Sequence, residues 1–154
     1  MIEAVVIPGS ISIPFRYSAG RTASRFFVEL RDHRRIMGTR CPACGRVLVP
    51  ARSFCAACSV ETDRWIEVGP EGTLVTWTTV HLPLPHLPVP PPCTLGLIRL
   101  DGADTDFLHL IGGDERALRV GERLRAVWGE RRSGSLLDLA YFAPIVGSRV
   151  NSAP

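Results

Sequence analysis

The chain has 154 residues, of which 45% are apolar and 21% charged, and this composition is typical of a globular protein and excludes wholesale disorder. No apolar run approaches the ~20 residues that a membrane helix needs, and the first ten residues lack the features of a secretory signal, so we expect a cytoplasmic protein with no membrane association. The net charge of +3 is uneven: residues 16–64 hold ten Arg against four acidic residues, whereas residues 65–154 hold eight Arg against ten.

The first forty residues predict one edge strand and one helix. Residues 11–17 alternate apolar and polar side chains, and Pro14 suits the edge of a sheet better than its centre. Apolar residues then recur at near-helical spacing with arginines between them, which predicts a helix from about 21 to 37 that ends at Gly38. The simplest interpretation of these arginines is a solvated helix face.

Four of the five cysteines form two C-x-x-C pairs, Cys41 with Cys44 and Cys55 with Cys58. In a reducing compartment two such pairs favour a metal site over disulfides. Four thiolates with no histidine or carboxylate among them are typical of structural zinc, whereas a catalytic zinc keeps an open position. We therefore predict one structural zinc ion, bound by these four cysteines.

The ribbon that carries these cysteines needs tight turns. Gly45 permits the unusual backbone conformation that the first pair requires, whereas Ser59 stands at the corresponding place of the second. Residues 47–50 are expected to begin a hairpin with its turn at 51–53. The fifth cysteine, Cys93, is interpreted as a small apolar residue in preference to a reactive thiol.

The remainder of the chain predicts a small Greek-key barrel. Five segments rich in β-branched and aromatic residues are expected to be strands, and they span 73–81, 94–100, 106–111, 122–130 and 136–145. Residues 115–120 can form one helical turn. The proline-rich residues 82–92 must be an extended loop, which serves either as a stiff connector or as a docking arm.

The sequence contains no convincing catalytic group. No nucleophile elbow, zinc-protease motif or phosphate-binding loop is present. The histidines His33, His81, His86 and His109 are interpreted as solvated or hydrogen-bonded side chains, and His81 or His86 would be the first choice for a functional one. We therefore predict no catalytic residue and a protein that is not an enzyme on its own.

The order of these motifs is similar to a known family. A basic helix precedes R-C-P-A-C-G-R-V-L-V-P-x-R-x-F-C-x-x-C, then come W-I-E-V-G-P-E-G-T-L-V-T-W-T-T-V-H, L-I-R-L-D-G and L-R-V-G-E-R-L-R-A-V-W. From about residue 20 to 145 the chain resembles the zinc-ribbon plus OB-fold proteins of the domain-of-unknown-function 35 family. The resemblance implies a mainly β protein with an N-terminal helix, a rubredoxin-like zinc ribbon and a five-stranded OB-fold barrel. The first 20 residues have no counterpart in the family. We expect a division into 1–38 (N-terminal segment and helix), 39–64 (ribbon), 65–147 (barrel) and 148–154 (disordered tail).

The resemblance also implies a function. Family members act as accessory subunits of thiolase-like or lipid-transfer-type enzymes in lipid metabolism, where the partner performs acyl transfer, condensation or retro-aldol cleavage. We expect a hetero-oligomer that binds or channels acyl-CoA. Arginine suits the phosphates of coenzyme A, and the candidates for these phosphates or an acidic partner are Arg34, Arg35, Arg46 and Arg52. The alternative is a nucleic-acid-binding protein, which the acidic barrel half disfavours.

Overall fold

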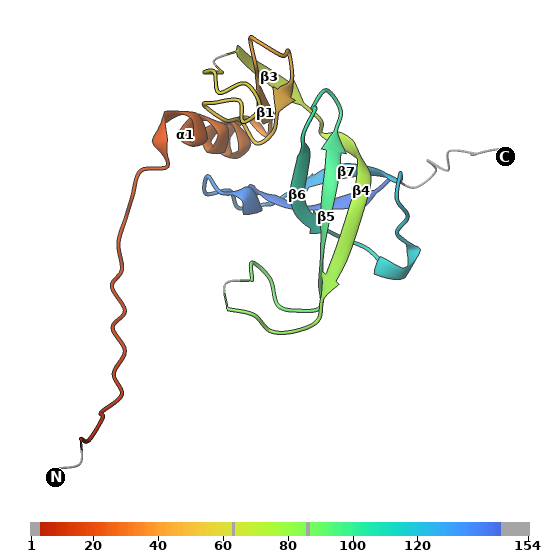
Figure 1. Ribbon diagram of the computed structural model, residues 1–154. Coiled ribbons are helices and arrows are strands. Elements are labelled where there is room, and N and C mark those ends of the chain that lie inside the picture. Colours follow the sequence, from red (N-terminus) through yellow and green to blue (C-terminus); the bar gives the residue numbers. More distant parts are fainter. Residues whose placement is uncertain (1–3, 63, 86, 146–154) are drawn as a thin grey trace.

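The computed structural model describes residues 4–62, 64–85 and 87–145. A helix and a small sheet lie at one end of a β-barrel, and an extended N-terminal arm runs away from them (Figure 1). The predicted fold class, mainly β with one N-terminal helix, is confirmed. The tail predicted at 148–154 lies outside the described residues. In the part of the chain that the structure describes, no helix is long and apolar enough to cross a membrane.

The N-terminal helix is shorter than the sequence predicts. α1 spans Gly20–Val28 and continues into one π-helical turn, η1, at Glu29–His33. The chain leaves the helix at Arg34, whose φ of 53° is left-handed. Phe26 and Leu30 lie on its buried face and pack into the main core.

The segment predicted as the end of this helix is a strand, so that part of the prediction is wrong. β1 (Ile36–Arg40) is the central strand of a three-stranded sheet, and its first four residues are all buried. Gly38 lies inside β1 and does not end a helix, and a Cβ at this position would lie 2.8 Å from the carbonyl oxygen of Leu48. The glycine therefore lets the neighbouring strand approach β1. Ile36 and Met37, two adjacent apolar residues, fit a helix or a buried strand equally well.

The edge strand predicted at 11–17 is also wrong. Residues 4–19 form neither strand nor helix before α1, and they run as an extended arm (Figure 1). Their large apolar side chains are 73–88% exposed. The alternating pattern is that of a strand, but the arm has no neighbouring strand with which to pair.

Two further strands complete the ribbon sheet. β2 (Val47–Leu48) and β3 (Arg64–Val68) flank β1, and both are antiparallel to it. β3 was not predicted from the sequence. The hairpin expected within 47–53 is wrong as well, because β2 pairs back onto β1 and the turns lie inside the C-x-x-C pairs, at 42–44 and 56–58.

The second half of the chain forms the predicted barrel. Its strands are β4 (Glu71–Val80), β5 (Cys93–Leu100), β6 (Asp106–Ile111), β7 (Arg123–Trp128) and β8 (Leu139–Pro144). The order β4-β5-β6-β8-β7 closes the barrel, with β6 and β8 parallel and the other pairs antiparallel. This is the five-stranded Greek-key barrel of an OB-fold. The helical turn expected at 115–120 is η2 (Glu115–Ala117).

Asp138 explains why the last strand begins later than predicted. It closes a short 3₁₀ helix, η3 (Leu136–Asp138), and its side chain is only 1% exposed. Its carboxylate accepts hydrogen bonds from the backbone N–H groups of residues 133 and 134, each at 2.8 Å. In the same loop, Arg132 donates to the carbonyl oxygen of Arg31 at 2.7 Å, which joins the β7–β8 connection to η1.

The ribbon and the barrel share one hydrophobic core. A single cluster of buried side chains includes residues of α1, η1, the ribbon sheet and every barrel strand, among them Phe26, Leu30, Ile36, Val49, Val68, Leu74, Ile98, Phe107, Leu124 and Phe142. Apolar burial of this kind is the dominant favourable term in folding. The ribbon therefore does not sit on the barrel as a loosely tethered module.

Hydrogen bonds from the β5–β6 turn reinforce this junction. Asp104 accepts from the N–H of Val47 through its carboxylate (2.8 Å) and donates its own N–H to the carbonyl of Val47 (2.9 Å). The Thr105 hydroxyl accepts from the N–H of Val49 (2.8 Å) and donates to the carbonyl of Val49 (3.0 Å). The turn thus acts as a pairing partner for the edge of the ribbon sheet that β1 does not cover.

Replacing Thr105 with valine tests this junction. Thr105→Val keeps the shape of the side chain but leaves the backbone N–H and C=O of Val49 without the hydroxyl, so we expect the free energy of unfolding to fall by about 1–3 kcal/mol. Urea denaturation measures it. Thr78→Val, the same change at an exposed position of β4, is the control. Equal stability of the two variants would contradict the proposed role of Thr105.

Candidate metal centre

The four paired cysteines come together as predicted. The Sγ atoms of Cys41, Cys44, Cys55 and Cys58 all lie within 4.8 Å of one another, and those of Cys44 and Cys55 are 3.9 Å apart. Cys41 and Cys55 are buried, whereas Cys44 is exposed. Four convergent sulfurs can complete a tetrahedral shell around one metal ion.

The first pair is shaped by a tight backbone turn. The N–H of Gly45 donates to the carbonyl of Cys41 at 3.0 Å, and the N–H of Cys41 donates to the carbonyl of Arg46 at 2.8 Å. The N–H of Cys44 points at the Cys41 sulfur, 3.5 Å away. Gly45 has a φ of +74°, which is the left-handed conformation expected for this glycine.

The second pair repeats this geometry without a glycine. The N–H of Ser59 donates to the carbonyl of Cys55 at 2.8 Å, and the N–H of Cys55 donates to the carbonyl of Val60 at 3.0 Å. Ser59 itself adopts a φ of +53°, a conformation that costs a non-glycine residue energy. The second turn is therefore built to the same plan as the first, and its serine bears the strain.

Two threonines that the sequence analysis did not single out fix the segment between the pairs. The buried Thr39 hydroxyl donates to the carbonyl of Arg52 at 2.8 Å and accepts from its N–H at 3.0 Å. The Thr62 hydroxyl donates to the same carbonyl. Both contacts join residues at least ten positions apart, so no local sequence signal identifies them. They tie the loop before Cys55 to the central strand β1.

The surroundings shift the pKa values of two of the thiols. Hydrogen bonding from the Cys44 backbone lowers the pKa of the Cys41 thiol to about 7, so this sulfur becomes a thiolate more readily than that of an ordinary cysteine. A hydrogen bond between the Cys58 thiol and the sulfur of Cys44, together with burial, raises the pKa of Cys58 to about 12. Cysteines bind a metal ion as thiolates, so binding of the ion is expected to release thiol protons.

This donor set suits structural zinc. Zinc accepts four thiolates, and a set of four protein ligands leaves no position for a substrate or an activated water. The site would therefore hold the two turns together and supply no chemistry of its own.

The four arginines proposed for coenzyme A or an acidic partner lie in different surroundings. Arg35 forms an ion pair with Glu29, with 2.7 Å between its Nη2 and the Oε2 of the carboxylate. Arg34 and Arg46 are exposed, one after η1 and the other in the first cysteine turn. Arg52 lines an open cavity of about 530 Å³ between the start of α1 and residues 51–54, together with Arg21 and the half-exposed ring of Phe54. Among the four, Arg52 is the one that lines a described cavity.

The described histidines and the fifth cysteine lie outside the cysteine cluster of the metal centre. His109 is buried in the barrel, where its Nε2 lies 3.0 Å from the carbonyl oxygen of Leu136 and burial lowers its pKa. His33 pairs with Glu29, and Cys93 is buried in β5, in agreement with its interpretation as an apolar residue. His86 lies outside the described residues.

Removal of one buried ligand tests the metal centre. We expect Cys41→Ser to reduce the zinc content from one ion per chain to almost none and to lower the melting temperature, because three thiolates no longer close the shell. Mass spectrometry of the metal and thermal unfolding measure the two effects. Cys93→Ser, the same change at a buried cysteine outside the cluster, should keep its zinc. Zinc-free wild-type protein that is fully folded would contradict the site.

Comparison with solved structures finds the same fold. The chain superimposes on a crystal structure of a DUF35-family protein of unknown function from Sulfolobus solfataricus, with a TM-score of 0.59 and 24% identity over 81% of this chain and 84% of that one. It also superimposes on a chain described as the Ltp2-ChsH2(DUF35) aldolase, with a TM-score of 0.63 and 22% identity over 84% of this chain and 98% of that one. A search of curated protein sequences gives no match.

Two family models match consecutive parts of the sequence. Residues 28–63 match the rubredoxin-like zinc ribbon domain of ChsH2, and residues 65–129 match the C-terminal OB-fold domain of ChsH2. The first match contains all four clustered cysteines, and the second contains four of the five barrel strands. The sequence, the metal centre and the fold thus agree, and the chain belongs to the DUF35 family of ChsH2-like proteins, in which a zinc ribbon precedes an OB-fold.

Proposed function

We propose that the chain is a non-catalytic accessory subunit of a thiolase-like or lipid-transfer-type enzyme that acts on acyl-CoA. The observation that carries the proposal is the likeness to ChsH2, which is matched over both domains and occurs in a solved structure as part of the Ltp2-ChsH2 aldolase. In this assignment the partner performs the reaction, and the present chain stabilises the complex and helps to bind the acyl-CoA.

The buried polar groups of the chain support an accessory role. The carboxylate of Asp138 is used to hold a loop, and Glu29 is used to hold Arg35 and His33. His109 packs against the rings of Phe107 and Phe142, with centroid distances of 5.6 and 5.7 Å. Each of these groups contributes to the fold, and none faces the cavity beside Arg52.

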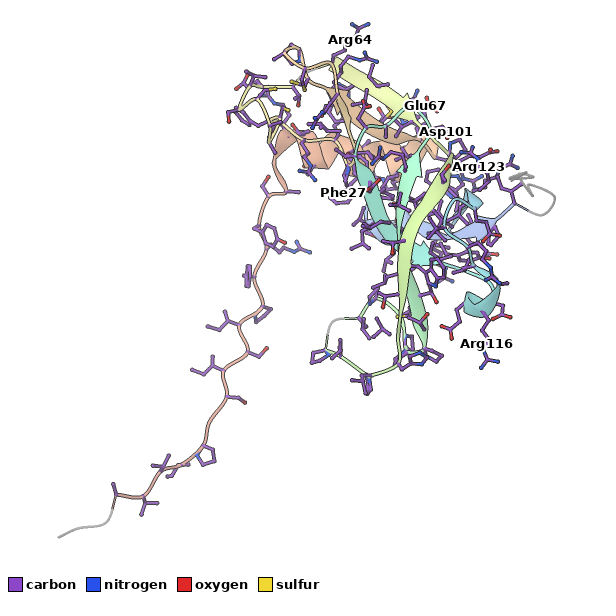
Figure 2. The ribbon with its side chains drawn as sticks, turned by 45° about the vertical axis from the view of Figure 1, so that its right-hand side comes forward. Phe27, Arg64, Glu67, Asp101, Arg116 and Arg123 are labelled. Carbon is purple, nitrogen blue, oxygen red and sulfur yellow. The ribbon has the colours of Figure 1, made fainter. Side chains whose placement is uncertain are left out.

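The barrel does not favour the nucleic-acid alternative. Three of its arginines are paired with carboxylates. Arg123 binds Asp101 with 2.5 Å between Nη2 and Oδ2 (Figure 2), Arg125 binds Glu71, and Arg99 binds Asp106. The ion pair also lowers the pKa of Asp101, so it persists at neutral pH. Single-strand binding needs free cations and exposed aromatic platforms, whereas Phe107 and other barrel aromatics pack in the core.

Coenzyme A binding is the finer part of the proposal, and the surroundings of Arg52 support it. Two guanidinium groups, of Arg21 and Arg52, and the ring of Phe54 line one open cavity. Guanidinium groups suit phosphates, and an exposed aromatic ring can stack on a nucleotide base. The backbone of Arg52 is held by Thr39, so a change of its side chain leaves the ribbon intact.

Co-expression with a thiolase-like protein encoded beside this chain tests the accessory role. We expect the two proteins to elute together with one zinc per copy of this chain, and the acyl-CoA activity of the pair to exceed that of the partner alone. Size-exclusion chromatography with metal analysis and an acyl-CoA assay measure this. Separate elution of two folded, zinc-containing proteins would contradict the proposal.

Charge reversal tests the coenzyme A site. We expect Arg52→Glu to raise the Kd of the complex for coenzyme A by about tenfold or more, since a charge-assisted contact is replaced by repulsion. Isothermal titration calorimetry measures it. Arg116→Glu makes the same change in η2, toward the end of the barrel remote from Arg64 and the ribbon (Figure 2). Equal affinities of the two variants would place coenzyme A elsewhere.

A further inference from the structure

The N-terminal arm is the largest apolar feature that the fold does not use. In residues 4–19 the described structure forms no strand and no helix, and the aromatic contact between Phe15 and Tyr17, with ring centroids 5.9 Å apart, joins the arm only to itself. The arm extends from Gly20 away from the ribbon and the barrel (Figure 1). Exposed apolar side chains on this scale are typical of a surface that another molecule covers.

Six of the seven large apolar side chains of the arm have odd residue numbers, and Val6 is the exception. Successive side chains of an extended chain point to opposite faces, so residues of the same parity share a face. The odd positions carry Val5, Ile7, Ile11, Ile13, Phe15 and Tyr17, interrupted at Gly9, and these six side chains are 73–88% exposed. The even positions from 6 to 18 carry Val6, Pro8, Ser10, Ser12, Pro14, Arg16 and Ser18, so this face is free of large apolar side chains from position 8 onward. Thirteen residues of this pattern span about 40 Å when extended.

The two prolines leave the arm with one complete hydrogen-bonding edge. In an extended chain the N–H and C=O groups of successive residues point to opposite edges, so residues of the same parity share an edge. Pro8 and Pro14 have the same parity, so both missing N–H groups fall on the even edge. On the odd edge every residue from 5 to 17 keeps its donor and its acceptor. The arm can therefore pair fully on one side only, as the outermost strand of a sheet.

We infer that residues 5–17 are a docking strand that adds to an open sheet edge of the partner enzyme, with the odd side chains in an apolar groove beside that edge. This inference rests on the proposed accessory role and names the segment that makes the contact. Addition of an extended segment to a sheet edge is a recurrent mode of recognition, in which the backbone provides affinity and the pockets provide specificity.

The chain itself offers no edge that matches the arm. The barrel is closed, and the part of β4 that lacks a β7 partner, residues 75–80, is less than half as long as the arm. In the ribbon sheet, the open edge of β3 is only as long as Arg64–Val68. The outer edge of β2 is already covered by hydrogen bonds with Asp104 and Thr105. These are the longest open edges among the described residues, and a second copy of the chain would offer the same short edges. We therefore infer that the arm pairs with a different protein.

The charge of the arm points to the same kind of partner. Arg16 is the one charged residue between positions 4 and 19. A nucleic acid or an acidic surface would be recognised by several cations, whereas this arm offers apolar side chains and backbone groups. The partner surface is thus apolar and rich in unpaired backbone groups.

Paired aspartates on opposite faces of the arm test the inference. The full chain is titrated into the purified thiolase-like partner by biolayer interferometry as wild type, as Ile11→Asp/Ile13→Asp and as Ser10→Asp/Ser12→Asp. Both variants gain two negative charges, and the substituted positions of one variant are next to those of the other along the chain. We expect the first to raise the Kd by about tenfold or more and the second to leave it within about threefold, because only the odd face is covered. Zinc content and melting temperature should be the same in all three, since the arm lies outside the core.

Proline substitutions test which edge pairs. Ile11→Pro removes an N–H from the odd edge and should weaken binding by about tenfold relative to Ile11→Ala. Ser12→Pro removes an N–H from the edge that Pro8 and Pro14 already interrupt, and it should bind as well as Ser12→Ala. Equal losses for the two prolines would exclude pairing by a single edge and overturn this part of the inference.

The outcomes separate this inference from the proposed function. Binding by wild type and by both aspartate variants with one Kd would overturn the docking strand and leave the accessory role intact. No binding by folded, zinc-loaded wild type would overturn both. A dimer of this chain that dissociates in Ile11→Asp/Ile13→Asp would assign the arm to a second copy, which also overturns a strand that docks on the enzyme.

Discussion

The position of the metal centre depends on one short strand that is held from both sides. β2 pairs with β1 on one side, and on the other it meets Asp104 and Thr105 of the β5–β6 turn. Because β2 directly follows the first cysteine turn, any shift of the barrel against β2 would also shift Cys41 and Cys44. The backbone contacts are directional and the shared core is close-packed, so the two domains form one rigid unit. Within this unit the zinc ion would hold together the two cysteine turns at the outer end of the ribbon.

The distribution of charge follows from the same arrangement. Three acidic residues of the barrel pair with its arginines: Glu71 and Asp101 with Arg123, and Asp106 with Arg99. At the ribbon end Arg46 and Arg52 stand on turns whose backbone is fixed by the cysteines and by Thr39. The basic first part of the sequence therefore becomes a basic end of the molecule, and the slightly acidic second part becomes a barrel in which several arginines are paired with carboxylates.

Much of the fold and the whole metal site could be predicted from the sequence, because both depend on local signals. The barrel strands are β-branched segments between glycines, and the cysteine spacing determines the ligand set. The errors arose where a distant partner decides the structure. Ile36 and Met37 continue a helical pattern, but burial between two strands makes them part of β1. The pairing of Val47 with Asp104 spans 57 positions, and the pairing of Arg35 with Glu29 requires the left-handed turn at Arg34, so neither has a local signature.

The position of the two prolines in the arm has a consequence for the free protein. An exposed strand with an apolar face is a template on which further strands can stack, and such strands are a frequent origin of aggregation. A strand whose N–H and C=O groups are all present along one edge can join a sheet through that edge. Where its other edge lacks N–H groups, a further strand pairs with it poorly. Pro8 and Pro14 thus interrupt the edge on which a further strand would add, which disfavours the growth of a sheet from the free arm.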